Sequence, residues 1–285
     1  MLGVIGLRVK EPMVTTMIWS CPNCKAELIG SGDLWSCSNG HSFDVAREGY
    51  VNLLPAHHKH SRTPGDPPEM VMARRRLLAT GLYEPLANTI TELLAKRAVT
   101  SLLDIGCGEG YYDGLLTSGI RNLDLFGVDI AKPAVRIAAK AFPGHQYAVA
   151  SNSRLPVMDN IVDAVLKVFA PSNDAETLRV LKPEAFYLEV GPSNRHLWEL
   201  RAALYDTPFE HKPLRNLLAG ATLLEHGVCA YTRELSHEQI NDLVLATPFA
   251  HRGHREKRQR LVARASMIIS IEFGWRLYQK DRPIA

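Results

Sequence analysis

Three of the five cysteines in this chain of 285 residues lie close together near its start. Two residues separate Cys21 from Cys24, twelve more precede Cys37, and three more lead to His41. Thiolates and an imidazole at such spacing are typical tetrahedral zinc ligands, because a C-x2-C turn brings two thiolates to one ion. A redox pair of Cys21 and Cys24 is the alternative, but no βαβ pattern surrounds it. We therefore predict a closed structural zinc site, which leaves the chemistry to the rest of the chain.

A second group of residues is typical of a site for a nucleotide-like ligand. Gly106, Gly108 and Gly110 follow an apolar run, and glycines without a β-carbon let a ligand approach the backbone and the next helix N-terminus. Asp129 ends the next apolar run, nineteen residues after Gly110. A carboxylate at that place can accept both hydroxyl hydrogens of a ribose. Nicotinamide dinucleotides and S-adenosylmethionine both use this arrangement.

Three details favour S-adenosylmethionine. Tyr111 stands where a dinucleotide fingerprint has its third glycine. Asp104, inside the end of the first strand, suits a cationic amino-acid-bearing ligand better than a pyrophosphate. The polar turn ASNSRLP at 150–156 suits an adenine edge. The alternative is that the glycines only form a tight turn. We predict S-adenosylmethionine as cofactor, with Asp104, Gly106, Gly108 and Asp129 among its binding residues.

Strand-like and helix-like segments alternate around these residues. The predicted strands lie in SLLDIG, LDLFGVDIA, QYAVAS, VDAVLKVFAPS and AFYLEVGP. Helical crossovers between apolar strands imply an α/β fold with a parallel sheet covered on both faces, and ligands then bind beyond the carboxyl ends of the strands. The last two apolar runs, ATLLEHGVCAYTREL and SMIISIEFGWRLY, are expected to form an antiparallel edge.

Composition limits the class of protein. With 46% hydrophobic and 22% charged residues, the chain is expected to be a soluble globular protein of about two domains. No apolar run is long enough for a membrane span, and the N-terminus lacks a signal-peptide core and cleavage site. We therefore expect a cytoplasmic protein without a membrane partner, and a reducing compartment would also keep zinc thiolates free.

Basic residues are gathered in three runs, although the net charge is only +3. The runs are HHKHSR at 57–62, RRR at 74–76 and HRGHREKRQR at 251–260. Each run alone could be a solvated face. Three runs in one chain favour a polyanionic partner, because lysine and arginine neutralise phosphates.

Together these segments resemble a known family. CPNC, CSNGHSFDVAREGYVNLLP, SRTPGD, ARRRLLATGLYEPL, LDIGCGEGYYD and RHLWELR look like the bacterial 23S ribosomal RNA guanine-N1 methyltransferases, from about residue 17 to the C-terminus. The resemblance implies a zinc ribbon that recognises an RNA hairpin and a Rossmann-like class I methyltransferase domain. It implies S-adenosylmethionine-dependent methylation of guanine N1 in 23S ribosomal RNA. It also implies zinc bound by Cys21, Cys24, Cys37 and His41, and cofactor contacts from Tyr83, Gly108, Glu109 and His196.

The expected domain boundaries follow from this resemblance. Residues 1–16 have no counterpart and are expected to be an extension or disordered, with Met17 as an alternative start. The expected parts are then a zinc-binding RNA-recognition module at 17–50, a basic linker at 51–80 and the methyltransferase domain at 81–285.

The sequence leaves several roles open. Tyr83 suits either an aromatic lid over the cofactor or core packing. His196 ranks below Asp129 on residue type alone. Guanine N1 must lose its proton during methylation, and Asp113, Glu189 and His196 are all candidate bases that spacing does not separate. The turn APSN at 170–173 lacks the Asn/Asp-Pro-Pro-aromatic pattern of enzymes that methylate exocyclic amines, which suits a ring nitrogen.

Two other functions compete with this interpretation. One is a methyltransferase for another RNA or a small molecule, with a purely structural ribbon. The other is an RNA-binding protein whose methyltransferase fold has lost its activity. The basic runs favour RNA, and the intact Asp104, Gly106, Gly108 and Asp129 argue against lost activity. The particular guanine, the need for a ribosomal particle and the oligomeric state, with a homodimer as one option, are left open.

Overall fold

The computed structural model describes residues 17–55, 64–212, 214–215, 217–247, 249 and 255–282. The N-terminal extension, the basic run at 57–62 and the first part of the run at 251–260 lie outside these residues. Within the described ranges, no helix is both long enough and apolar enough to cross a membrane.

An eight-stranded sheet forms the centre of the molecule, in the order β10-β11-β9-β8-β5-β6-β7-β4. The strands are β4 (Tyr50–Asn52), β5 (Ser101–Ile105), β6 (Asp124–Asp129), β7 (Gln146–Val149), β8 (Val162–Val168), β9 (Leu181–Pro192), β10 (Ala221–Ser236) and β11 (Ser266–Lys280). β4 to β9 are paired in parallel, whereas β11 is antiparallel to both β9 and β10. The predicted parallel sheet and its antiparallel edge are confirmed.

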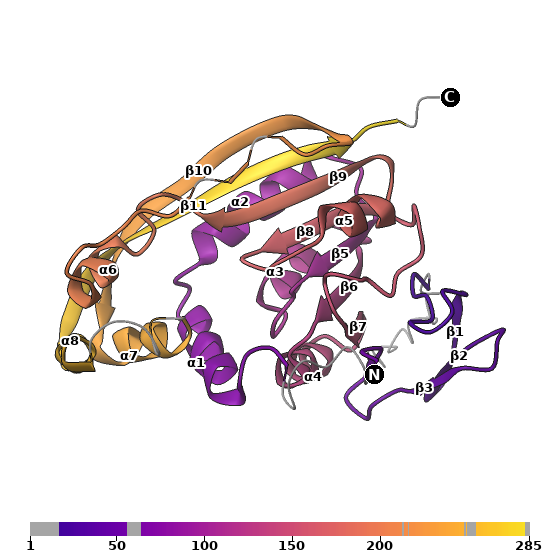
Figure 1. Cartoon of the computed structure of the whole chain (residues 1–285), viewed down its shortest axis with the longest axis horizontal. Helices are drawn as coiled ribbons and strands as arrows, with labels where there is room; N and C mark the ends of the chain where they lie inside the picture. Colours follow the sequence, from indigo (N-terminus) through magenta and orange to yellow (C-terminus); the bar gives the residue numbers. More distant parts are fainter. Residues whose placement is uncertain are drawn as a thin grey trace, which may run out of the picture.

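Most of the helices cover one face of the sheet or gather at one end of it, whereas α5 lies on the opposite face. They are α1 (Pro68–Ala79), α2 (Glu84–Ala95), α3 (Tyr111–Gly119), α4 (Lys132–Ala141), α5 (Asp174–Val180), α6 (Trp198–Leu204), α7 (His237–Leu245) and α8 (Arg255–Val262). Leu86 of α2, Leu116 of α3 and Val135 of α4 share one buried core with Leu102 and Leu166 of the sheet. The long strands β10 and β11 extend beyond the sheet toward α6, α7 and α8 (Figure 1).

A zinc ribbon covers part of the second face. Its antiparallel strands are β1 (Leu28–Ser31), β2 (Leu34–Cys37) and β3 (Ser42–Asp44). Trp19 anchors the ribbon: its ring centroid lies 5.7 Å from that of Trp35 and 6.3 Å from that of Phe126 on β6, and its Nε1 donates to Oε1 of Gln146 at 2.6 Å. The ribbon and α5 therefore cover the face of the sheet that further helices usually cover in a doubly wound fold.

The stretch predicted to be a basic linker, 51–80, contains most of β4 and all of α1. β4 adds a parallel strand beside β7, with Val51 opposite Ala148. α1 packs mainly against α7 and also contacts α4. The chain between the ribbon and α2 is therefore part of the folded structure at β4 and α1, and it brings α1 to the edge where β5 and β6 end.

Candidate functional site

The four predicted zinc ligands converge on one point. Cys21 and Cys24 come from the turn before β1, and Cys37 and His41 from the end of β2 and the turn that follows it. Their ligand atoms all lie within 4.8 Å of one another. The Sγ atoms of Cys24 and Cys37 are 3.7 Å apart, and Cys37 Sγ lies 3.5 Å from His41 Nδ1. Tetrahedral Zn–S bonds of 2.3 Å would place two sulfurs about 3.8 Å apart, so the cluster fits zinc.

Local backbone geometry shapes both halves of this zinc centre. Lys25 donates its N–H to the carbonyl of Cys21, and Gly40 donates to the carbonyl of Cys37, so each ligand pair lies on a tight turn. A hydrogen bond from Asn39 lowers the pKa of the Cys24 thiol to about 6. This favours the thiolate, which is the metal-binding form.

A cavity of about 340 Å³ lies at the carboxyl ends of β5, β6 and β8. It is the predicted position for a ligand in an open α/β sheet. Its wall includes five predicted cofactor residues, Tyr83, Gly106, Gly108, Glu109 and Asp129. The other lining residues are Gly65, Asp66, Arg74, Leu78, Cys107, Tyr111, Tyr112, Ile130, Asn152, Val168, Phe169, Ala170 and Pro171.

The backbone of the glycine loop, residues 106–110, requires glycine at its first position, Gly106. Gly106 has φ +81°, and a β-carbon there would lie 2.3 Å from Cβ of Ala170. The loop is fixed to the end of β6, because the N–H groups of Gly106 and Cys107 both donate to the carbonyl of Val128. This brings the backbone of the loop to the wall of the cavity without a side chain in the way.

Asp129 ties the loop to the neighbouring strand. Its Oδ2 accepts from the N–H of Gly108 at 3.0 Å, and its Oδ1 accepts from the N–H of Ala131 at 2.7 Å. Burial raises the pKa of this carboxyl group, and the two backbone N–H groups act in the opposite direction. Asp129 is thus held by the backbone in one orientation at the cavity wall.

Unpaired buried oxygens provide the test of whether this cavity fits S-adenosylmethionine. Among the described residues, Asp104 Oδ1, Glu109 Oε1 and Asn152 Oδ1 are buried without a hydrogen-bond partner. Glu109 and Asn152 line the cavity, and Asp104 lies beneath the glycine loop. All three atoms can accept, and unpaired buried acceptors are costly. A ligand with an ammonium group and an adenine amine supplies donors for the two unpaired oxygens at the cavity wall, so Glu109 and Asn152 fit this cofactor.

Asp104 belongs to a buried carboxyl pair. It is 2% exposed and does not line the cavity directly. Burial and the neighbouring Asp113 raise its pKa well above the usual range, and burial raises the pKa of Asp113 to about 6. Tyr147 donates its hydroxyl to Oδ2 of Asp113 at 3.0 Å. The pair forms a polar layer under the glycine loop.

Arg74 is a site residue that sequence reasoning assigned to a different role. It lines the cavity and binds two acids: Asp66 at 2.7 Å through Nη1 and Glu109 at 3.3 Å through Nε. Burial raises the pKa of Glu109, and the charge of Arg74 counteracts this rise. Arg74 therefore holds the acid of the glycine loop and the segment before α1 together. The run RRR gave no signal for this role, because its partners lie 8 and 35 residues away.

An aromatic cluster borders the cavity beyond the end of β8. Phe169 lines the cavity and is 44% exposed, and its ring centroid lies 5.5 Å from that of Phe273 and 5.6 Å from that of His196. Its φ is +55°, which is a genuine outlier for a bulky residue and costs about 1–3 kcal/mol. Tyr83 packs edge-on against Phe273 at 4.8 Å and also lines the cavity. Tyr83 is thus packed against the core at the cavity wall, and its role as a lid over the cofactor stays a prediction.

His196 lies outside the cavity wall. Its side chain is 5% exposed, and its Nδ1 accepts the N–H of Glu272, so the neutral ring carries its proton on Nε2. Burial lowers its pKa to about 3. A cofactor contact from His196 stays a prediction.

None of the three candidate bases is free at the cavity. Asp113 is fully buried, Glu189 forms an ion pair with Lys167 at 2.5 Å, and His196 is both buried and hydrogen-bonded through Nδ1. None of them lines the cavity. The site therefore favours positioning of the reactants over proton removal by one of these groups.

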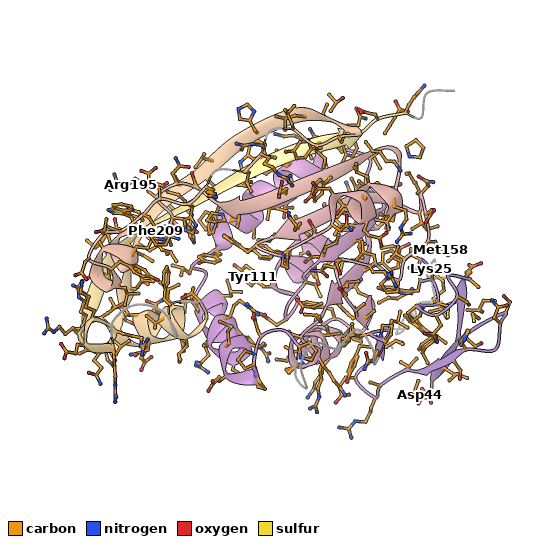
Figure 2. The ribbon with its side chains drawn as sticks, viewed as in Figure 1. Lys25, Asp44, Tyr111, Met158, Arg195 and Phe209 are labelled. Carbon is orange, nitrogen blue, oxygen red and sulfur yellow. The ribbon has the colours of Figure 1, made fainter. Side chains whose placement is uncertain are left out.

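Some basic residues of the predicted runs form ion pairs in the structure, and others are exposed. Arg76 of the first described run pairs with Asp242 of α7, whereas Arg75 is exposed. In α8, Lys257 pairs with Asp206, and Arg260 lies 4.0 Å from Glu256. Figure 2 places Tyr111 near the middle of the molecule and Phe209 toward the end where α6 lies.

Comparison with known proteins agrees with both centres. Residues 19–62 match the family model described as "RlmA, N-terminal", a zinc ribbon, and residues 103–188 match a methyltransferase domain. The fold and the two centres define a class I methyltransferase domain that carries an N-terminal zinc ribbon. The chain belongs to the 23S rRNA (guanine-N1)-methyltransferase family. The predicted fold class, family, zinc and S-adenosylmethionine are thereby confirmed.

Two relatives carry this assignment. The "Putative 23S rRNA (guanine-N(1)-)-methyltransferase YxjB" of Bacillus subtilis (strain 168) is 31% identical over 271 residues, which cover 90% of this chain and 94% of the relative. The "23S rRNA (guanine(748)-N(1))-methyltransferase" of Streptomyces fradiae is 40% identical over 189 residues, 65% of this chain and 66% of the relative.

Proposed function

We propose that this chain methylates guanine N1 in a hairpin of 23S ribosomal RNA, using S-adenosylmethionine as the methyl donor. The observation that carries the proposal is the cavity with unpaired buried acceptors, in a chain whose zinc ribbon and sheet both match this family. When bound, S-adenosylmethionine supplies a methyl group activated on a sulfonium. The protein's residues then bind and orient the cofactor and the guanine.

In this proposal, different residues of the cavity bind different parts of the cofactor. Asp129 accepts the ribose hydroxyls, since each of its oxygens keeps a lone pair beyond the one used by the backbone. Asn152, on the polar turn after β7, accepts from the adenine amine. Glu109, at the cavity wall, attracts the ammonium group. Gly106 and Gly108 leave room for the amino-acid part.

Phe169 forms the acceptor side of the site. It is exposed although it lines the cavity, and Phe273 and His196 support it from behind. An aromatic face suits stacking on a guanine, which contributes about 1–3 kcal/mol per base. We infer that Phe169 holds the base so that N1 faces the methyl group.

Positioning then supplies most of the acceleration. Holding two reactants in line can contribute about 7–11 kcal/mol. Because Asp113, Glu189 and His196 are all engaged elsewhere, the N1 proton leaves to solvent in this proposal and no catalytic base is assigned.

The partner and the compartment follow from the same proposal. The RNA partner is a hairpin of 23S ribosomal RNA, which the ribbon recognises. A cytoplasmic location is supported by the cysteines, because none of the five forms a disulfide in the described structure and a reducing compartment keeps the zinc ligands reduced. A homodimer stays a prediction, which sedimentation equilibrium can test.

Methyl transfer from labelled S-adenosylmethionine tests the proposal. Purified protein is incubated with transcribed 23S ribosomal RNA, with transfer RNA and with free guanosine. We expect label in the ribosomal RNA alone. Equal labelling of transfer RNA or guanosine would support the alternative of another RNA or a small-molecule substrate and would overturn the proposal.

A further inference from the structure

A second, larger cavity adjoins the cofactor cavity. It has a volume of about 880 Å³, lies between α1 and α4, and shares Asp66 and Ile130 with the cofactor cavity. Its floor is apolar and includes Val71, Ile137 and Val149. Its rim carries four cations, Arg75, Lys132, Arg136 and Lys140. Nothing in the cofactor chemistry requires this cavity.

The cations of α4 form one stripe. Lys132, Arg136 and Lys140 are spaced four residues apart, so they lie about 6 Å apart along one side of the helix. Like charges at this spacing weakly destabilise a helix. Lys132 also stands in the first turn, which contains no acid and has the positive end of the helix dipole. An anion bound beside Lys132 would offset this repulsion.

Acidic side chains among the described residues neutralise few of the cations around this cavity. Arg136 pairs with Glu48 at 2.8 Å, but Arg75, Lys132 and Lys140 form no ion pair with any described residue. Asp66 is the only acid among the described lining residues, and Arg74 already binds it at 2.7 Å. The groove is therefore a cationic surface with an apolar floor, directly beside the reacting site.

We propose that this α1–α4 groove binds backbone phosphates of the RNA strand next to the target nucleotide. The inference rests on the proposed function, because it takes the RNA as the partner. The stripe spans about 12 Å, and one strand of a duplex carries a phosphate about every 3.4 Å of axis, so two or three phosphates can be neutralised at once. Glu48, close after the ribbon, contacts Arg136, which places the groove between the ribbon and the cofactor cavity.

The test compares two pairs of substitutions. Lys132→Gln with Lys140→Gln removes two unpaired cations of the groove. Lys96→Gln with Arg121→Gln removes two exposed cations at the opposite end of the sheet, where β5 and β6 begin, and serves as the matched control. Dissociation constants for transcribed 23S ribosomal RNA are measured over a range of salt concentrations, and that for S-adenosylmethionine is measured by calorimetry.

We expect the groove pair to reduce the slope of log affinity against log salt by about 1.4 to 1.8, which is two phosphates at about 0.7 each in a single strand and about 0.9 each in a duplex. The control pair should leave the slope unchanged, and both pairs should bind S-adenosylmethionine as the parent does. An unchanged slope in the groove pair, or an equal loss in both pairs, would overturn the inference alone if the parent binds and methylates this RNA. A parent protein that neither binds nor methylates it would overturn the proposed function and the groove together.

Discussion

Gly108 donates its backbone N–H to Oδ2 of Asp129 at 3.0 Å, so the glycine loop after β5 is fixed to the end of β6 by a carboxylate. The same carboxylate is the proposed acceptor for the ribose hydroxyls. One residue thus shapes the loop and binds the ligand. Its substitution should therefore weaken cofactor binding by two routes.

Asp129→Ala should weaken S-adenosylmethionine binding by about 2–4 kcal/mol, because hydrogen bonds to a charged group contribute about 1.5–3 kcal/mol each. Asp129→Asn should cost less, because its carbonyl oxygen still accepts one of the two backbone N–H groups. Calorimetry measures both values. An Asp129→Ala protein with parental affinity would remove Asp129 from the cofactor site.

Phe169→Ala should lower kcat/KM for RNA methylation by roughly 10- to 100-fold, as expected when a base loses a stacking partner. S-adenosylmethionine affinity should change little, and Phe169→Tyr should retain most of the activity. Steady-state kinetics with transcribed RNA check these values. Equal activity of the alanine and tyrosine variants would show that no base stacks there.

The backbone at residue 169 gives a second, independent result. Because φ is +55°, Phe169→Gly should be more stable than Phe169→Ala by about 1 kcal/mol. Urea unfolding of the two variants measures this difference. A less stable glycine variant would show that the left-handed conformation is not retained.

The rate of methylation should depend on pH through the substrate rather than through a protein base. Burial lowers the pKa of His196 to about 3, so this ring is neutral at every pH above that value and has no titration step between pH 5 and 8. Single-turnover rates should then rise with pH with a slope of about 1 up to at least pH 8. His196→Asn should keep this slope, since Asn offers an acceptor in place of Nδ1. A plateau near pH 6.5 that the variant abolishes would identify His196 as the base.

Zinc removal should destabilise more than the ribbon. Trp19, Trp35 and Cys37 share one buried core with Phe126 and Val128 of the sheet, so the ribbon is a cover for the second face. Cys21→Ser with Cys24→Ser should lower the melting temperature of the whole chain and expose Trp19, with Cys229→Ser as the matched control. Differential scanning calorimetry and zinc analysis check this. A zinc-free variant whose sheet melts at the parental temperature would show that the ribbon folds independently.

The sequence predicted the features whose residues lie close together along the chain. The zinc ligands lie within 21 residues, and mainly apolar strands precede Gly106 and end at Asp129. Arg74 and Phe169 could not be assigned in the same way. Their roles depend on partners that only the folded chain brings near, Glu109 for Arg74 and Phe273 for Phe169.

The position of the ribbon on the sheet could not be predicted from the sequence, because it also depends on contacts between distant residues. Trp19 contacts Gln146 across 127 residues, and no periodicity in either segment indicates this pairing. β4 was equally hard to find, because three residues are too short for a period. Its parallel pairing with β7 comes from the fold rather than from the letters YVN.

The most direct measurement is nucleoside mass spectrometry of the reaction product. Transcribed 23S ribosomal RNA is incubated with the protein and S-adenosylmethionine, digested to nucleosides and mapped by fragment, with ribosomal RNA from a deletion strain as the unmodified reference. The account predicts one 1-methylguanosine, confined to a single hairpin, and its absence when Asp129→Ala replaces the parent. A methyl group on an exocyclic amine or on another base, or no methylation by a protein that binds both zinc and S-adenosylmethionine, would contradict it.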